Sequence, residues 1–145
     1  MDTKSKHVMA EFRGCDPNTL NNVKWIEGVM RRAAEAAFAT VMQSSFHQFG
    51  PHGVSGVLVL AESHLSVHTW PERGYAAADI YTCGDRCKPE RAHEVLRLAL
   101  GATTCEVMVV ERGLPGTNGM RLVDHQTYSA PETVDQRAQS GQRID

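Results

Sequence analysis

The sequence has no long apolar run and no strong excess of charge of either sign. No stretch approaches the ~20 consecutive apolar residues that a membrane-spanning helix needs. The first residues, MDTKSKHVMAEF, also lack the apolar core of a signal peptide. The formal net charge is only −2, which argues against nucleic acid or an anionic membrane as the main partner. We therefore expect a cytoplasmic protein with no nucleic-acid or membrane partner.

Cysteines are few and show no regular disulfide framework. They stand at Cys15, Cys83, Cys87 and Cys105, and a cytoplasmic chain keeps such thiols reduced. The chain has 145 residues, of which 41% are hydrophobic and 22% charged, and it contains no internal repeat. These proportions are typical of one globular domain that can bury a conventional core.

Hydrophobic periodicity and turn residues predict six strands and two helices. We expect a short strand over 7–12, a helix over about 18–38 and a second helix that begins at Pro89. The other expected strands cover about 39–49, 54–60, 63–70, 75–83 and 105–110. This order predicts an α+β fold, with two layers in each protomer and the helices on one face of a mostly antiparallel sheet.

The chain becomes polar and rich in glycine and proline after Gly113, with GLPGTNG followed by SAPETVDQRAQSGQRID. We interpret residues 1–113 as the functional domain and residues 114–145 as a polar C-terminal extension that is partly disordered. The last twenty or so residues are expected to form a loose tail.

Two short turns predict which residues face each other in the central hairpins. A turn at Ala61-Glu62 pairs Ser55 with His68, and a turn over 71–74 places Ser63 near Thr82 or Cys83. The Ala-Glu turn lacks the glycine or asparagine that such hairpins prefer. We therefore expect strained backbone there.

The two polar clusters, Ser55 with His68 and Ser63 with Cys83, cannot easily meet within one chain. Ser63 and His68 are five residues apart, roughly 16 Å along a strand, and they point to opposite faces. A two-fold dimer places each cluster of one protomer against the other cluster of its partner. We therefore expect a homodimer with shared active sites, built as an α-β-β-α sandwich.

The stretch SGVLVLAESHLSVHTWPERGYAAADIYTCG carries Glu-Ser, His-x-x-x-His, Trp-Pro-Glu and Thr-Cys-Gly in register. It resembles the signature of the prokaryotic S-adenosylmethionine decarboxylase proenzymes, which depend on a pyruvoyl group. The likeness extends upstream through SSFHQFGPHGVSGV and the opening HVMAEF, and onward to about Arg112. It therefore covers most of the chain but not the polar extension.

The resemblance implies that the chain cleaves itself between Glu62 and Ser63 into chains 1–62 and 63–145. Ser63 then becomes a covalent pyruvoyl group, which forms a Schiff base with the substrate. Ser55 and His68 assist this processing, and Cys83 donates a proton to the product carbon. The implied reaction converts S-adenosylmethionine to decarboxylated S-adenosylmethionine and CO2 for polyamine synthesis, including spermidine.

The resemblance also implies two substrate contacts. Phe49 matches an aromatic platform for adenine, and Glu72 matches a carboxylate that holds the ribose hydroxyls. One position departs from the expected pattern, because Arg13 stands where we expect an aromatic residue. This departure leaves open a related pyruvoyl-dependent decarboxylase that acts on ornithine or arginine.

Two further hypotheses come from other classes of protein. One is a metal-binding module that uses His64, His68, Cys83 and Cys87. On a strand the two histidines lie ~13 Å apart, too far for one zinc ion, so we expect no metal. The other is a non-catalytic homologue that folds and dimerises without processing, for which the sequence offers no positive support because every processing residue is present.

Overall fold

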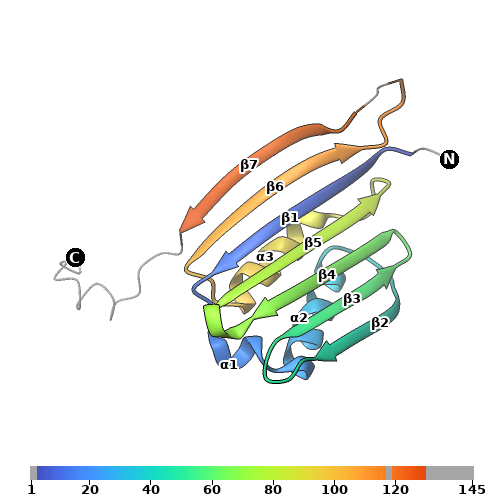
Figure 1. The fold of residues 1–145 in the computed structure, drawn as a ribbon. Helices are drawn as coiled ribbons and strands as arrows, with labels where there is room; N and C mark the ends of the chain where they lie inside the picture. Colours follow the sequence, from blue (N-terminus) through green and yellow to red (C-terminus); the bar gives the residue numbers. More distant parts are fainter. Residues whose placement is uncertain (1–2, 117–118, 130–145) are drawn as a thin grey trace, which may run out of the picture.

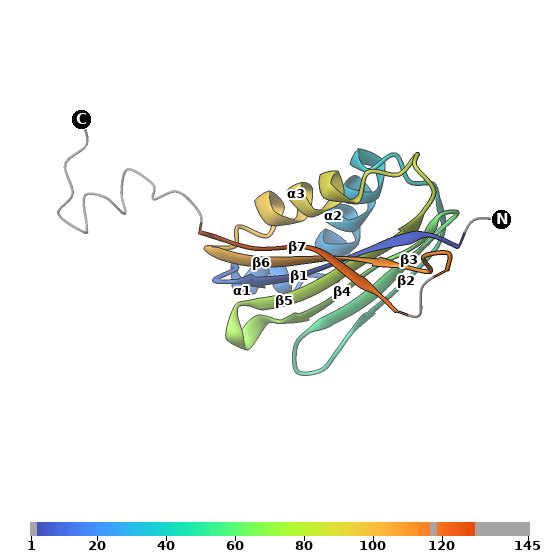
Figure 2. The same ribbon diagram turned by 90° about the horizontal axis from the view of Figure 1, so that it is seen from above.

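The computed structural model describes residues 3–116 and 119–129, which form one antiparallel sheet with the helices on one face (Figures 1 and 2). The strands are β1 (Ser5–Arg13), β2 (Val41–Gln48), β3 (Val54–Leu60), β4 (Ser63–Trp70), β5 (Tyr75–Cys83), β6 (Thr104–Arg112) and β7 (Arg121–Ser129). The helices are α1 (Pro17–Leu20), α2 (Val23–Ala36), α3 (Pro89–Ala99) and the short 3-10 turn η1 (Pro71–Arg73). The predicted α+β class is confirmed.

The strands lie in the order β2-β3-β4-β5-β1-β6-β7. The first strand of the chain is thus inserted between β5 and β6, and it pairs antiparallel with both. Figure 2 shows α2 and α3 over one face of the sheet, whereas no described helix covers the other. We call this uncovered surface the open face.

The predicted helix over 18–38 is wrong in one respect, because the chain breaks it into α1 and α2. The side chain of Asp16 accepts a hydrogen bond from the backbone N–H of Asn18, at 2.9 Å. The side chain of Asn22 does the same for Trp25, at 3.0 Å. An asparagine side chain that caps a new N-terminus competes with continuation of the preceding helix, which explains the break.

Strand β7 was not predicted, because its residues fall in the expected polar extension. All nine residues of RLVDHQTYS are exposed, so the segment has no buried face for hydrophobic periodicity to reveal. It forms the edge of the sheet by pairing with β6, where Thr104 faces Ser129. Backbone hydrogen bonds suffice for such an edge strand. The rest of the predicted tail, residues 130–145, lies outside the described part of the chain.

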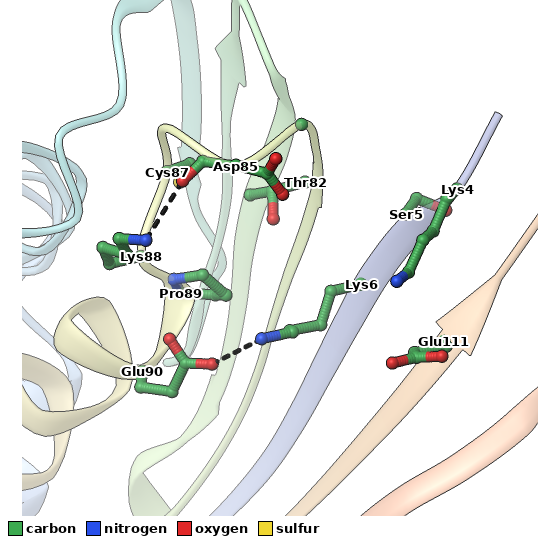
Figure 3. A pocket seen from close by; sticks show the side chains of 11 residues that line it. Lys4, Ser5, Lys6, Thr82, Asp85, Cys87, Lys88, Pro89, Glu90 and Glu111 are labelled. Carbon is green, nitrogen blue, oxygen red and sulfur yellow. Dashed lines mark hydrogen bonds and ion pairs between the residues drawn. The ribbon is translucent and has the colours of Figure 1, made fainter. Parts of the chain in front are cut away.

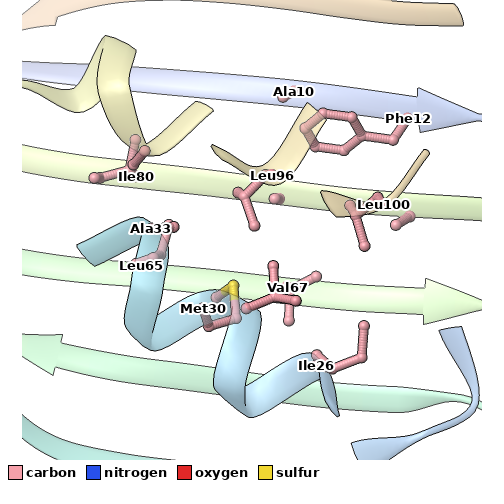
Figure 4. Packing of buried hydrophobic residues seen from close by; sticks show 14 of the residues in the cluster. Ala10, Phe12, Ile26, Met30, Ala33, Leu65, Val67, Ile80, Leu96 and Leu100 are labelled. Atoms are coloured by element: carbon pink, nitrogen blue, oxygen red, sulfur yellow. The ribbon is translucent and has the colours of Figure 1, made fainter. Parts of the chain in front are cut away.

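The hydrophobic core lies between the helices and the inner face of the sheet (Figure 4). Its fully buried large side chains include Phe12, Leu20, Ile26, Met30, Leu58, Leu65 and Leu100. Each such side chain stabilises the fold by about 1.5–3 kcal/mol. A slip of one residue in β4 would move Leu65 and Val67 to the open face. The core therefore fixes His64, Ser66 and His68 on the open face.

Candidate active site

The central hairpins have the predicted register. Ser55 faces His68 across β3 and β4, and Ser63 faces Thr82 across β4 and β5. The Ser55 hydroxyl lies 2.8 Å from Nδ1 of His68, which is hydrogen-bonding distance. One end of the open face thus carries a hydroxyl–imidazole pair.

The turn between β3 and β4 holds the Glu62–Ser63 peptide bond in a strained geometry. Leu60 faces Ser63 across this turn, and Ser63 has φ +151°, in a region that residues other than glycine rarely adopt. The Glu62 carboxylate accepts a hydrogen bond from the backbone N–H of Thr40 at 3.0 Å, which anchors the turn to the segment before β2. The expected backbone strain is therefore present at residue 63.

Cys83 lies directly against this peptide bond. Its backbone N–H donates to the carbonyl oxygen of Glu62 at 3.2 Å, and its thiol donates to the same oxygen at 3.3 Å. Two donors on one carbonyl oxygen can stabilise negative charge that develops there when the carbon is attacked. The expected cluster of Ser63 with Cys83 thus has a geometry suited to acyl chemistry.

Cys83 is the exposed thiol of the chain, and all four cysteines are free. Burial raises the pKa of Cys15 and that of Cys105 to about 11, and burial also raises the pKa of Cys87. These three thiols therefore exchange protons less readily at neutral pH. All three are buried and pack as small side chains.

A cavity of about 390 Å³ opens beside the Ser55–His68 pair. It brings together four residues that the sequence singled out, namely Phe49, Ser55, His68 and Glu72. It also includes two side chains to which the sequence reasoning assigned no role, His52 and Trp70. His52 Nε2 lies 3.0 Å from a carboxylate oxygen of Glu72. The position of Trp70, two residues after His68 on the same strand face, was the signal that could have found it.

The Ser63–Cys83 cluster and the cavity lie at opposite ends of β4, because Ser63 begins this strand and Trp70 ends it. No residue of the cluster lines the cavity within the described chain. The predicted site residues therefore form two separate groups within one protomer.

Arg13 does not line the cavity. Its guanidinium lies over the ring of Tyr75, 4.7 Å from the ring centroid, and 3.6 Å from the Glu11 carboxylate. Its charge is therefore directed to Glu11 and Tyr75.

A polar network on the open face centres on Asp79. This carboxylate is bonded by His7 at 2.5 Å, by His64 at 3.1 Å and by the Ser66 hydroxyl. Burial alone would raise the pKa of Asp79, but the hydrogen bonds from Ser66, His64 and His7 outweigh it, so the pKa lies below its usual value. His64 is thus part of a polar network on the open face.

The metal-ligand set considered from the sequence is not brought together. Within residues 3–116 and 119–129, the one group with suitable spacing is His7, His64 and Asp79, whose ligand atoms lie within 4.8 Å of one another. Arg112 lies 3.3 Å from Nδ1 of His7, and arginine can only donate there. Nε2 of His7 must then carry the proton that it shares with Asp79. This tautomer has no lone pair at Nε2 for a metal ion.

A second cavity, of about 440 Å³, lies on the helix side near the start of α3 (Figure 3). Lys6 forms an ion pair with Glu90 at 2.8 Å, and the Lys88 ammonium donates to the Asp85 carbonyl at 3.1 Å. None of the predicted catalytic residues lines this cavity. The candidate site is therefore the open face and not this cavity.

Fold and site together define a single-sheet α+β protein that presents hydroxyl, imidazole and thiol groups at two neighbouring hairpins. The family model described as S-adenosylmethionine decarboxylase matches residues 6–113. The chain belongs to this family. No described helix is long and apolar enough to span a membrane.

Curated relatives agree with this assignment. The chain is 46% identical over 125 residues to the S-adenosylmethionine decarboxylase proenzyme of Shouchella clausii, an alignment that covers 86% of this chain and 97% of the relative. It is 50% identical over 113 residues to the proenzyme of Thermotoga petrophila, covering 78% and 87%.

Solved structures give the same result. The crystal structure of adenosylmethionine decarboxylase from Aquifex aeolicus matches with a TM-score of 0.74 and 37% identity, covering 82% of this chain and 100% of that one. The Trypanosoma brucei enzyme matches with a TM-score of 0.54 at 12% identity, over 72% of this chain and 45% of that one, which shows the fold alone.

Proposed function

We propose that the chain cleaves itself between Glu62 and Ser63 and then decarboxylates S-adenosylmethionine to feed polyamine synthesis. The observation that carries this proposal is the contact of both Cys83 donors with the Glu62 carbonyl oxygen, beside a serine with φ +151°. The relatives named as proenzymes support it. Residues 1–113 are the proposed catalytic domain, and the cytoplasmic location stays a prediction.

In the proposed cleavage, the Ser63 hydroxyl attacks the carbonyl carbon of Glu62. Negative charge develops on the oxygen that Cys83 contacts, and expulsion of the amide nitrogen leaves an ester. Removal of the α-proton of residue 63 then expels the Glu62 carboxylate. One water molecule hydrolyses the resulting dehydroalanine, releasing ammonia and leaving a pyruvoyl group at residue 63.

The surroundings of residue 63 fit a pyruvoyl group. The bond that breaks lies in the turn, whereas Ser63 already belongs to the β3–β4 and β4–β5 ladders. Cutting the turn therefore leaves both ladders intact, with residue 63 as the first residue of a strand. When formed, the pyruvoyl group supplies an electron sink for the loss of CO2. Cys83 is proposed to donate the proton that replaces CO2 on the substrate carbon.

We also propose that two protomers pair through their open faces and share two active sites. Met9, Val59 and Trp70 are large apolar side chains that lie exposed on this surface, as is common at interfaces. A two-fold axis would set the Ser55–His68 pair of one protomer against the Ser63–Cys83 cluster of its partner. The His68 imidazole of one protomer would then take the α-proton of Ser63 of the partner subunit. Within one chain these two groups lie too far apart for this transfer.

The cavity beside His68 is the proposed substrate-binding site. Phe49, which is 46% exposed, offers an aromatic surface to the adenine, and Glu72 offers acceptors to the ribose hydroxyls. Arg13 lies outside this cavity, so it does not disqualify a cationic sulfonium substrate. Neither the family nor the relatives described above points to ornithine or arginine.

The test compares Ser63→Ala with the unchanged chain and with Ser129→Ala, an exposed serine at the end of the edge strand β7. Ser63→Ala should remain uncut and release no CO2 from S-adenosylmethionine, whereas Ser129→Ala should cleave and react normally. Assays with S-adenosylmethionine, ornithine and arginine run in parallel decide the substrate. Turnover by Ser63→Ala would overturn the mechanism.

A further inference from the structure

Two segments far apart in the sequence bring a histidine and a glutamate together at the cavity beside His68. His52 lies in the β2–β3 loop (residues 49–53), and Glu72 lies in η1, which follows β4. Figure 1 shows both segments at the same end of the sheet, and both residues line the cavity. Nε2 of His52 lies 3.0 Å from Oε2 of Glu72. The carboxylate proposed to hold the ribose hydroxyls therefore has an imidazole partner.

The β2–β3 loop that carries His52 is held in place by hydrogen bonds at its base. The backbone N–H of Phe49 donates to the Gly53 carbonyl at 2.8 Å. The side chain of Asn21, between α1 and α2, accepts from the backbone N–H of Gly53 at 2.9 Å. The side-chain amide of Gln48 donates to both, at 2.9 Å to Asn21 and at 3.0 Å to the Gly53 carbonyl. His52 therefore extends from a loop whose path is fixed.

The backbone of Glu72 is fixed as well. Gly74 ends η1 in the left-handed conformation, with φ +59°, and its N–H donates to the Pro71 carbonyl at 3.1 Å. The Gly74 carbonyl accepts from the backbone N–H of Cys15 at 2.9 Å, which joins η1 to the segment after β1. A glutamate side chain on such a fixed backbone still has several rotamers, and ordering it costs conformational entropy. The contact with His52 favours one of these rotamers.

We propose that His52 is a positioning residue for Glu72 and thereby a determinant of selectivity for the ribose of the substrate. A carboxylate accepts at two oxygens, so a bond from His52 leaves Glu72 with acceptors for ribose hydroxyls. Holding the carboxylate in one orientation before the substrate arrives reduces the entropy lost on binding. The proposal rests on the proposed function and deepens it, because it names the group that orients the ribose acceptor.

Substitutions of His52 test its hydrogen bond. His52→Leu removes the donor, so KM for S-adenosylmethionine should rise about 3- to 10-fold while kcat and chain cleavage stay the same. His52→Gln restores a donor nitrogen and should recover most of the affinity. The control is Glu94→Gln, which weakens the ion pair with Arg97 on α3 and should change neither constant. Since His52 is exposed, we expect these variants to fold. If His52→Leu does not, His52→Phe, which also lacks a donor, takes its place.

The ribose hydroxyls give a more specific readout. One probe is methylthioadenosine, which has the adenosyl group but no carboxylate to lose. The other is the same compound without its 2′ and 3′ hydroxyls, and both are measured as inhibitors of decarboxylation. The unchanged chain should prefer the hydroxylated inhibitor, and His52→Leu should weaken that inhibitor alone. An equal loss of affinity for both inhibitors would overturn the proposal, because His52 would then not act on the ribose.

A double substitution tests whether His52 acts through Glu72. In a Glu72→Ala background, His52→Leu should raise KM little further, because the group that it orients is gone. Fully additive effects would overturn the proposal. Unchanged kinetic constants in His52→Leu would also overturn it and leave the proposed function standing, since the unchanged chain would still decarboxylate S-adenosylmethionine. An unchanged chain that neither cleaves nor releases CO2 would overturn both.

Discussion

The backbone amide and the thiol of Cys83 both contact the carbonyl oxygen of Glu62, at 3.2 and 3.3 Å. This oxygen belongs to the peptide bond that the chain is proposed to break. The two donors differ in kind, because any residue at position 83 supplies the amide, whereas the thiol depends on cysteine. The same residue is thus proposed to serve in cleavage and in protonation of the product.

Cys83→Ser should separate these two roles. The amide remains and a hydroxyl replaces the thiol, so cleavage should continue at least in part. Decarboxylation should fall by about 10²-fold or more, because a hydroxyl is a far weaker acid than a thiol. Denaturing mass spectrometry measures the cleavage, and CO2 release measures the reaction. Cys87→Ser, at a buried thiol, is the control. Full activity in Cys83→Ser would remove Cys83 as the proton donor.

Because Ser55 is hydrogen-bonded to His68, we expect substitution of His68 to slow chain cleavage more than substitution of Ser55 does. His68→Ala removes the proposed base and should slow cleavage by about 10²-fold or more. Ser55→Ala keeps the imidazole but removes the hydroxyl that orients it. Its cleavage should therefore be slowed less than that of His68→Ala. The time course of chain cleavage in freshly synthesised protein measures both, with Ser129→Ala, at an exposed serine of β7, as control. If Ser55→Ala and His68→Ala cleave at the normal rate, the pair has no part in processing.

Asp79 should stabilise the fold at neutral pH. Asp79→Asn leaves donors of His7, His64 and Ser66 poorly paired, which should lower the free energy of unfolding by about 1–3 kcal/mol. Since the folded pKa of Asp79 lies below its unfolded value, its contribution is complete above about pH 4 and is lost as the pH falls through the folded pKa. Urea unfolding between pH 3 and pH 7 measures both effects.

The control for Asp79 is Asp85→Asn, at an exposed position in the loop before α3. It should change neither the stability at neutral pH nor its acid dependence. Equal stability of Asp79→Asn and Asp85→Asn would show that the network does not stabilise the fold.

His93 should make the free energy of unfolding depend on pH closer to neutrality than Asp79 does. Burial lowers its pKa, and its Nδ1 has no hydrogen-bond partner in the described structure. The folded chain therefore binds fewer protons than the unfolded chain just below pH 6.5, so the free energy of unfolding should fall as the pH drops there. His93→Gln should flatten this slope, whereas His125→Gln, at an exposed histidine of β7, should preserve it. A slope that survives in His93→Gln would exclude His93 as its source.

The sequence predicted the register of the central hairpins because short turns constrain which residues pair. Ser55 with His68 and Ser63 beside Cys83 follow from turn position alone, and the inward leucines and valines exclude a slip of one residue. The Asp79 network could not be predicted from the sequence. His7 contacts Asp79 only because β1 is inserted beside β5. Nothing in the spacing of residues encodes that strand order.

Contacts made by particular side chains and loops could not be predicted from the sequence either. The stacking of Trp70 on Tyr75 and the pairing of His52 with Glu72 depend on rotamers and on the path of the chain after β2. Strand β7 was missed for another reason, because an exposed edge strand needs only backbone partners and shows no apolar alternation.

The mass of the purified protein under denaturing conditions tests the central claim most directly. The account predicts two chains, residues 1–62 and 63–145, the second lighter by one ammonia than a chain with an N-terminal serine. Borohydride should add two hydrogens to that second chain alone, because only it carries a ketone. A single uncut chain, or a second chain with a free amino group at residue 63, would contradict the account.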